Sequence, residues 1–113
     1  MVADFAALVA AGEVQVLLTG EDVAGFIVIR PGPGHLFIEN IAVHPDRQGQ
    51  GLGHRLMIFA EAAARERGLP ALELYTNAKM TENFPFYSGL GFVETERRHE
   101  DGFDRVYMRK RLT

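Results

Sequence analysis

The chain has 113 residues, which suffice for one domain with a single hydrophobic core, so we expect residues 1–113 to form one domain. It is 47% hydrophobic and 24% charged with a formal net charge of -3, which is typical of a globular protein and argues against a nucleic-acid partner, because phosphate backbones select a strongly basic face. The absence of cysteine excludes disulfides, thiolate metal sites and a cysteinyl covalent intermediate. We expect a cytoplasmic protein.

Near the N-terminus, an apolar stretch over residues 3–12 predicts a short helix. It places Phe5 and Leu8 at helical spacing and ends at Gly12. The stretch is too short to span a bilayer, and Asp4 stands where a signal peptide carries positive charge. We therefore interpret it as a packing helix and expect no membrane partner.

The next part of the chain has the composition of three strands. Two β-rich runs, Val14 to Leu18 and Ala24 to Ile29, flank turn-forming residues and predict an antiparallel hairpin. Residues 30–34 (RPGPG) then break regular structure. The stretch from His35 to Val43 returns to strand composition, and it ends at His44-Pro45 because proline disfavours helical angles in the residue before it.

The second half of the chain begins with the best-supported helix, from Leu52 to Arg67. Apolar residues recur there at intervals of three and four, and Gly68 supplies a stop signal. Downstream, Asp101-Gly102 is a strong signal for a tight hairpin turn. The other predicted elements are a strand from Pro70 to Thr76, a helical segment from Met80 to Ser88, and strands from Phe92 to Arg97 and from Asp104 to Arg109. The order α-β-β-β-α-β-α-β-β indicates a mixed α/β (α+β) fold.

A glycine-rich turn from Arg47 to Gly53 (RQGQGLG) lies between a predicted strand and the N-terminus of this helix. Backbone N–H groups at such a position have no intrahelical partners, the helix dipole favours an anion, and glycine lets a phosphate approach the amides. The turn therefore predicts a pyrophosphate site, with an ordinary loop and helix cap as the alternative. A P-loop does not fit, because His54-Arg55 replaces Lys-Ser/Thr, and a dinucleotide fingerprint fits poorly because it needs a further glycine or alanine at Arg55 or Leu56.

Two motifs in the chain carry a family resemblance. The segment Gln48-Gly49-Gln50-Gly51-Leu52-Gly53 resembles the Gln/Arg-x-x-Gly-x-Gly/Ala signature of the GCN5-related N-acetyltransferases. The segment Phe86-Tyr87-Ser88-Gly89-Leu90-Gly91-Phe92 resembles their Tyr-x-x-x-Gly-Phe element, and the strand over residues 38–43 with its His44-Pro45 step is also similar. The resemblance covers the chain from Val14 to the C-terminus.

The resemblance implies a mixed, mainly antiparallel sheet with helices on both faces, in which the parallel strands His35 to Val43 and Pro70 to Thr76 splay apart. It implies acetyl-CoA as co-substrate and an amine as acceptor. Separately, the scattered histidines lead us to expect no metal. By the same resemblance, the end of the first strand hydrogen-bonds the pantetheine arm through its backbone, and amides of the turn hold the pyrophosphate. The residues concerned are Ile41, Ala42, Val43, Gln48, Gly49, Gln50, Gly51, Leu52 and Gly53. Core packing explains the apolar character of Ile41 and Val43 equally well.

Acetyl transfer to an amine requires a proton for the departing thiolate, because a free thiol has a pKa of about 8.5. The resemblance gives this general-acid role to Tyr87, with an amphipathic core residue as the alternative. Glu39 lies on the strand that should line the cleft and is a candidate base. Strand alternation groups it with Phe37, Ile41 and Val43; the alternative is a solvated or ion-paired glutamate, with the amine arriving deprotonated. Without cysteine, direct attack in a ternary complex is expected.

Asn77 and Asn83 bracket the turn into the second predicted helix, where the family often carries an asparagine bonded to the coenzyme arm. Met80 occupies the most usual place here, so Asn83 is the candidate, and helix capping or turn formation is the alternative for both asparagines. The four histidines show no metal-type spacing. Residues 97–101 form a charged hairpin that either borders the acceptor pocket or is a solvated tip.

Relative to the family, the region before the first hairpin is abbreviated, which would leave one sheet edge uncovered. We therefore expect a homodimer that covers this edge. Two functions remain open. One is an active N-acetyltransferase acting on a small amine, an amino acid or a protein amine, and the other is an acetyl-CoA-binding module without catalysis that serves as a sensor or as a subunit of a complex. Retention of Tyr87 favours the first.

Overall fold

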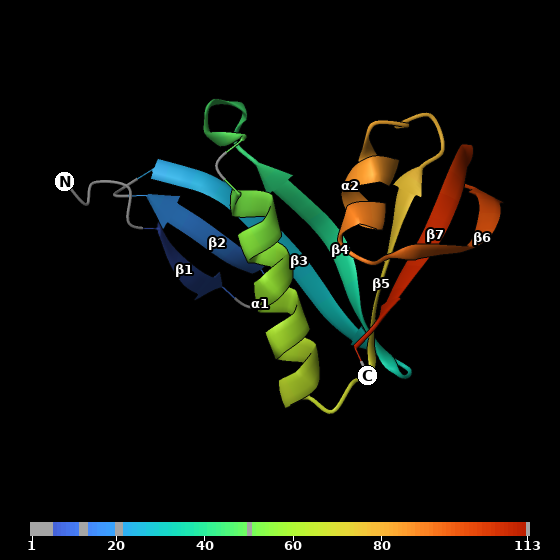
Figure 1. Cartoon of the computed structure of the whole chain (residues 1–113), viewed down its shortest axis with the longest axis horizontal. Coiled ribbons are helices and arrows are strands. Elements are labelled where there is room, and N and C mark those ends of the chain that lie inside the picture. Colours follow the sequence, from blue (N-terminus) through green and yellow to red (C-terminus); the bar gives the residue numbers. More distant parts are fainter. Residues whose placement is uncertain (1–5, 12–13, 20–21, 50, 113) are drawn as a thin grey trace.

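The computed structural model describes residues 6–11, 14–19, 22–49 and 51–112. In these ranges seven strands form one sheet in the order β1-β2-β3-β4-β5-β7-β6, accompanied by two α-helices and one 3-10 turn (Figure 1). The strands are β1 (Ala6–Ala11), β2 (Val14–Thr19), β3 (Asp22–Gly32), β4 (His35–Val43), β5 (Ala71–Asn77), β6 (Val93–Glu100) and β7 (Phe103–Arg111). The helical elements are η1 (Pro45–Arg47), α1 (Leu52–Glu66) and α2 (Asn83–Gly89).

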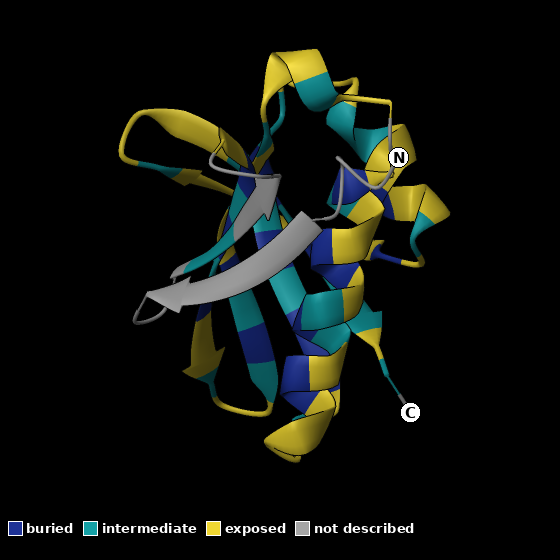
Figure 2. Cartoon of the chain, turned by 90° about the vertical axis from the view of Figure 1, so that its left-hand side faces the viewer, coloured by how far each residue is buried: buried dark blue, intermediate teal, exposed yellow. Residues whose placement is uncertain are grey.

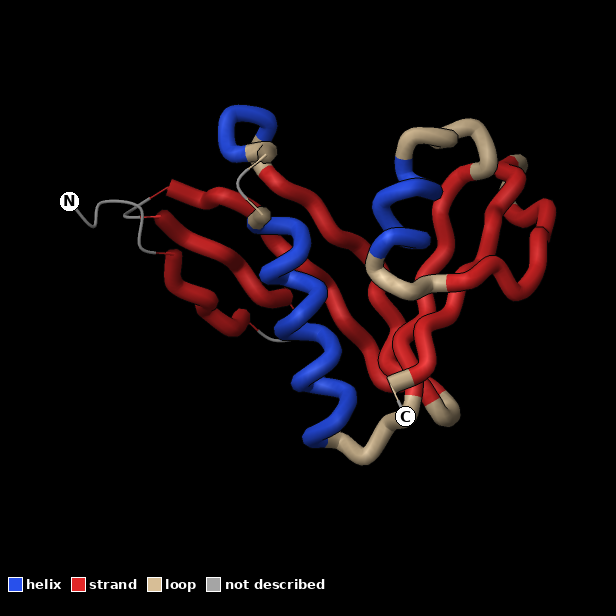
Figure 3. The backbone as a smooth tube through the Cα atoms, in the orientation of Figure 1, coloured by secondary structure: helices blue, strands red, loops and turns tan. Residues whose placement is uncertain are grey.

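The sheet divides into two limbs at the parallel strands β4 and β5. Within the described residues these strands pair only at Leu36 with Leu72 and at Phe37 with Glu73, and the other neighbouring strands are antiparallel. Beyond Phe37 the two strands diverge, so the backbone forms a V that opens toward their C-terminal ends (Figure 3). The predicted class, a mixed and mainly antiparallel sheet with two splayed parallel strands, is confirmed.

Both α-helices pack against the same face of the sheet, which corrects the expectation of helices on both faces. The helix α1 connects β4 to β5, and α2 connects β5 to β6, so both crossovers step in the same direction across the sheet. Such crossovers are right-handed, and two steps in one direction therefore place both helices on one side. Side-chain contacts agree, because Lys110 Nζ lies 2.6 Å from Glu61 Oε2 of α1 and Thr76 accepts a hydrogen bond from Asn83 of α2.

The hydrophobic core lies between the helices and this face. Alternate residues Leu72 and Leu74 of β5 and Val106 and Met108 of β7 are buried there. Figure 2 shows the buried residues of α1 on the side that faces the sheet and the exposed ones on the side away from it. The buried residues of α1 are Leu52, Leu56, Met57, Ala60, Ala63 and Ala64. Apolar burial at this helical spacing explains why the sequence predicted α1 so well.

A β-bulge in β4 changes which side chains face the core. Val28 pairs with Asn40, but Ile29 pairs with Ile38, so Glu39 has no partner in the β3–β4 ladder. Before the bulge Ile38 is buried in the core, and after it Ile41 packs against the same core. The predicted grouping of Glu39 with Phe37, Ile41 and Val43 on one face is therefore wrong, because simple alternation does not continue across an inserted residue.

The predicted N-terminal helix over residues 3–12 is also wrong in its described part. Residues 6–11 form β1, which pairs antiparallel with β2 from Ala6 opposite Thr19 to Ala11 opposite Val14. Residues 3–5 and 12 lie outside the described ranges. A short apolar run is compatible with a helical turn and with a strand, and here hydrogen bonding to the adjacent β2 stabilises the strand.

The turns follow the sequence more closely. Asp101 and Gly102 have φ values of 52° and 81°, which confirms the predicted tight hairpin turn. The break expected over residues 30–34 is shorter than predicted, because β3 continues to Gly32, which pairs with His35.

Candidate functional site

A cavity of about 620 Å³ lies at the wide end of the V, where the end of β4, the N-terminus of α1 and the helix α2 meet. It is lined by Ile41, Ala42, Val43, Arg47, Gln48, Gly49, Gly51, Leu52, Gly53, His54, Met80, Asn83, Phe86 and Tyr87. The structure thus brings together almost all of the predicted site residues. Of those predicted, Gln50 lies outside the described residues and Glu39 does not line the cavity.

The glycine-rich turn supplies backbone donors to this cavity. Gly49 and Gly51 have φ values of 84° and 76°, a left-handed conformation that glycine adopts without strain. Gly51 is the N-cap of α1, and no side chain caps the helix there. The backbone N–H of Arg55 bonds to the carbonyl of Gly51 at 3.0 Å, so the amides before it project beyond the helix end. These amides and the helix dipole favour an anion in the cavity.

Gly53 lies where a side chain would meet the second helix. A Cβ atom on Gly53 would stand 3.3 Å from Cζ of Phe86 and 3.8 Å from Cγ2 of Val43. The absence of a side chain therefore lets α1 and α2 approach each other beside the cavity. Of the other predicted residues in the turn, Leu52 is buried in the core and also lines the cavity. The Gln48 amide Nε2 donates to the carbonyl of Val43 at 3.4 Å.

The end of β4 forms a second wall. Ile41, Ala42 and Val43 pair with β3 on one side, but within the described residues their opposite edge has no partner strand, because β5 has already diverged. Ile41 and Val43 also pack against the core, so their side chains have a structural role in addition. An extended molecule with amide groups can hydrogen-bond to such a free strand edge.

Tyr87 of α2 brings a hydroxyl group to the cavity. Its ring contacts Phe86 and Phe92 with centroid distances of 5.3 and 5.9 Å, and only 9% of the residue is exposed. Burial raises the pKa of the Tyr87 phenol, so the phenol is protonated at neutral pH. Among the described residues the hydroxyl has no hydrogen-bond partner, which leaves its proton available to a ligand.

The candidate base Glu39 lies at the β4 bulge and pairs with Arg30, whose Nε is 2.5 Å from Glu39 Oε2. Its side chain is 41% exposed. The cavity lining contains no carboxylate within the described part of the chain. The geometry therefore brings the candidate acid, but not the candidate base, into the cavity.

The two asparagines that bracket the turn before α2 have different surroundings. Asn77 accepts a hydrogen bond from the backbone N–H of Lys79 at 2.9 Å, which is a turn-forming contact, and it does not line the cavity. Asn83 lines the cavity, and its Nδ2 donates to Thr76 Oγ1 at 3.2 Å and lies 3.9 Å from Met80 Sδ.

Four lining residues had not been assigned to the site, namely Arg47, His54, Met80 and Phe86. Arg47 is the first residue of the glycine-rich turn and His54 directly follows it, so their basic side chains carried a usable signal for a phosphate-binding wall. Phe86 directly precedes Tyr87, and its 42% exposure marks it as an apolar side chain at the cavity edge. Met80 carried no such signal.

The sheet face opposite the helices carries a row of aromatic rings. Phe37, Tyr75 and Tyr107 follow one another across β4, β5 and β7 with centroid distances of 5.8 and 5.4 Å. The guanidinium of Arg105 lies 4.4 Å from the centroid of the Tyr75 ring, and that of Arg98 lies 4.5 Å from the centroid of the Tyr107 ring. The contact between Phe37 and Tyr75 spans β4 and β5 just where their pairing ends.

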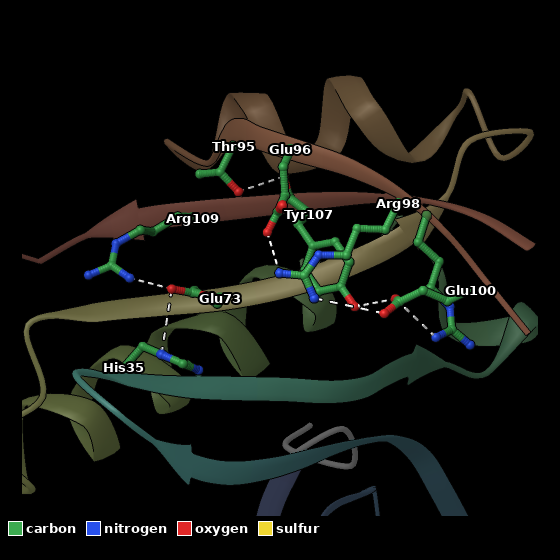
Figure 4. Close-up of polar contacts among 9 residues, drawn as sticks. His35, Glu73, Thr95, Glu96, Arg98, Glu100, Tyr107 and Arg109 are labelled. Atoms are coloured by element: carbon green, nitrogen blue, oxygen red, sulfur yellow. Dashed lines mark hydrogen bonds and ion pairs between the residues drawn. The ribbon is translucent and has the colours of Figure 1, made fainter.

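Charged groups on the same face are matched in ion pairs (Figure 4). Glu100 accepts a hydrogen bond from the Tyr107 hydroxyl at 2.6 Å and pairs with Arg98 and Arg105, and these contacts lower the pKa of Glu100. At the other end of the row, Glu73 pairs with Arg109 and lies 3.5 Å from His35 Nδ1. The predicted charged hairpin therefore packs on the aromatic row and does not line the cavity.

In the described ranges, no three His, Asp or Glu side chains are grouped so that they could hold a metal ion. No helix in these ranges is long and apolar enough to cross a membrane.

The chain matches the Acetyltransferase (GNAT) family over residues 3–92. It is 37% identical over 71 residues to mycothiol acetyltransferase of Rhodococcus opacus, covering 63% of this chain and 22% of that protein. It is 34% identical over 61 residues to aminoalkylphosphonate N-acetyltransferase of Salmonella typhimurium, covering 54% of this chain and 40% of that protein. The chain thus spans less than half the length of either relative.

Among solved structures, nourseothricin acetyltransferase superposes with a TM-score of 0.81 at 28% identity, covering 88% of this chain and 65% of that chain. The fold agrees with the sequence match. The chain belongs to the GNAT family of acetyltransferases.

Proposed function

We propose that the protein is an acetyl-CoA-dependent N-acetyltransferase that transfers an acetyl group to a primary amine by direct attack in a ternary complex. The observation that carries this proposal is the convergence, in one cavity, of uncapped helix amides, a free strand edge and a buried protonated phenol. These three features fit the three chemical parts of acetyl-CoA, which are a pyrophosphate, an arm with amide groups and a thioester.

Each wall of the cavity has a role in this proposal. The amides from Gln48 to Gly53 bind the pyrophosphate at the positive end of the α1 dipole. The backbone of Ile41, Ala42 and Val43 hydrogen-bonds the arm as an added strand would, because this edge of β4 is free. Acetyl-CoA supplies an activated acyl group, and the chain holds it where Tyr87 can reach the sulfur.

Tyr87 acts as the general acid. Its phenol is buried and protonated at neutral pH, and it donates a proton to the departing thiolate while the amine bonds to the acetyl carbon and the carbon–sulfur bond breaks. The amine nitrogen loses one proton in the same reaction. Glu39 is the candidate to take that proton. The alternative is release of the proton to solvent, and the pairing of Glu39 with Arg30 favours this alternative.

The acceptor class rests on the names of the relatives. The name of the aminoalkylphosphonate N-acetyltransferase states transfer to nitrogen, and the mycothiol relative is likewise named an acetyltransferase. We propose a small amine, an amino acid or a protein amine as the acceptor for this chain.

Calorimetric titration with acetyl-CoA, followed by measurement of thiol release with a panel of such amines, tests the proposed function. Saturable binding with turnover on one amine class supports it, and a failure to bind acetyl-CoA contradicts it.

A second candidate function is an acetyl-CoA-binding module without catalysis. The absence of a carboxylate from the described cavity lining favours it, because no group there accepts the amine proton. Binding of acetyl-CoA without thiol release on any amine would support this reading against the first.

We also propose that the chain forms a homodimer, as expected from the sequence. Within the described strands, β1 and β6 are the two edges of the sheet. The edge β6 is rich in charged side chains, which oppose strand pairing, so β1 is the edge proposed to pair. Light scattering over a range of concentrations checks this, and a monomer at high concentration would contradict it.

A further inference from the structure

Apart from the Tyr87 phenol, Thr76 is the only buried side chain with a polar group in the part of the chain that the structure describes, with 6% of the residue exposed. It follows Leu72 and Leu74 on the core face of β5, and its partner on β7 is Val106. Valine has nearly the shape of threonine, so packing at this position does not require a hydroxyl. A hydroxyl in an apolar row therefore points to a polar partner.

That partner is Asn83, in the first turn of α2. The Asn83 Nδ2 donates to Thr76 Oγ1 at 3.2 Å, and the same nitrogen lies 3.9 Å from Met80 Sδ. Asn83 and Met80 line the cavity, whereas Thr76 does not. With the two N–H donors of the amide directed at Thr76 Oγ1 and Met80 Sδ, the free hydrogen-bonding capacity of Asn83 is its Oδ1, which is an acceptor.

We propose that Thr76 is a positioning residue that fixes the Asn83 amide, so that Oδ1 accepts a hydrogen bond from an amide N–H of the coenzyme arm. This inference rests on the proposed function, because it assigns the arm to this cavity. Without the hydroxyl, the Asn83 amide is free to rotate and offers its nitrogen or its oxygen to the arm at random. Thr76 thus acts on the ligand through Asn83 and has no contact with it.

The test compares two ligands on purified full-length protein by calorimetry. Coenzyme A contains the arm, whereas adenosine 3′,5′-bisphosphate contains the nucleotide phosphates without the arm. We expect Thr76→Val to weaken coenzyme A binding about fivefold, the effect of one neutral hydrogen bond, and to leave the bisphosphate affinity unchanged. Thr76→Ser keeps the hydroxyl and should bind both ligands as the parent does.

A matched control is Thr95→Val, which removes a threonine hydroxyl bonded to the carbonyl of Tyr107 at 3.2 Å on β6, outside the cavity. It should leave both affinities unchanged. A double-mutant cycle tests whether Thr76 acts through Asn83. If it does, Thr76→Val should cause no further loss of coenzyme A affinity in an Asn83→Ala background.

Several results would overturn the inference. Unchanged coenzyme A binding in Thr76→Val, equal losses for both ligands, or a full additional loss in the Asn83→Ala background would each assign Thr76 to packing alone. Failure of the parent protein to bind coenzyme A is a different outcome, since it removes the proposed function itself and with it the role of Thr76.

Discussion

At the scale of single residues, the cavity depends on a few groups whose neighbours explain their identity. The Tyr87 phenol is held between two aromatic rings and is buried, which keeps it protonated. Gly51 adopts a backbone conformation that other residues resist, at the point where the helix must begin without a side chain in front of its amides.

Tyr87→Phe should lower kcat by about 100-fold or more, because general acid catalysis contributes at least that much when the leaving group is poor. The ring and its two aromatic contacts remain, so the dissociation constant for acetyl-CoA should stay within about twofold of the parent value. Steady-state kinetics and calorimetry measure the two quantities. An equal loss of binding and turnover would instead assign Tyr87 a structural role.

Gly51→Ala should reduce both stability and coenzyme affinity. At a φ of 76° a Cβ atom costs about 1 kcal/mol of unfolding free energy, and relaxation of the turn moves the amides that bind phosphate. Gly34→Ala is the matched control, because Gly34 has a φ of 71° with open space around it and lies in the β3–β4 turn outside the cavity. It should lose similar stability in chemical denaturation, and a matching loss of affinity would show that the effect of Gly51 is indirect.

At the scale of elements, β4 links the fold to the chemistry. Its bulge at Glu39 separates a half whose apolar side chains are buried in the core from a half that packs against the core and also lines the cavity. The neighbouring β3 holds the second half in place through Gly25, where a Cβ atom would stand 2.6 Å from the carbonyl oxygen of Ala42.

Gly25→Ala should therefore destabilise the protein by about 1–3 kcal/mol, the usual cost of overpacking, since the close atom belongs to the backbone of β4. The added Cβ atom also displaces the backbone of β4 and with it the free strand edge. Coenzyme binding by the folded fraction of the protein should therefore weaken. Gly89→Ala serves as the control, because nothing lies within 4 Å of its added Cβ. Urea denaturation measures the unfolding free energy of both variants. An unchanged unfolding free energy in Gly25→Ala would mean that β3 and β4 can move apart at this position without cost.

Glu39→Gln distinguishes the two routes for the amine proton. Because Glu39 is paired with Arg30 and lies outside the cavity, we expect kcat/KM to change less than about threefold with the shape of its pH profile retained. The pH dependence of kcat/KM checks this result. Loss of the acidic limb of the profile, together with a large fall in rate, would establish Glu39 as the general base.

The same elements show what the sequence could reveal. The glycine-rich turn, α1 and the Tyr87 segment were predictable because local residues determine them: positive φ values favour glycine, and apolar spacing marks a helix. The outward position of Glu39 was not predictable from local residues, because the bulge depends on how β4 pairs with β3. The hydrogen bond from Asn83 to Thr76 was equally hidden, since it joins a helix to a strand across the core.

At the scale of the whole molecule, the buried phenol also links stability to pH. The pKa of Tyr87 is raised above its ordinary value of 10.0 on folding, so its contribution to stability is complete below about pH 10 and is lost as the pH rises through the folded-state pKa. Tyr107, whose pKa is also raised, adds a loss of the same sign.

We therefore expect the unfolding free energy to fall more steeply with alkaline pH in the parent protein than in Tyr87→Phe. Denaturation curves at a series of alkaline pH values measure this slope for both proteins. Identical slopes would mean that the Tyr87 phenol ionises as easily in the folded state as in the unfolded chain.

The divergence of β4 and β5 affects which molecules can pair with the inner edges of these two strands. Unpaired strand edges normally occur at the rim of a sheet, where they can capture strands from other molecules. Here two such edges lie in the middle of the sheet, on the inner sides of a V whose one face is flanked by α1 and α2 (Figure 1). A slender, flexible chain can enter that space, whereas a strand that belongs to a folded neighbour is kept out by the limbs themselves. The space between β4 and β5 thus selects by size: the backbone groups on the inner strand edges can bind a small ligand, but they cannot pair with a strand of another folded molecule.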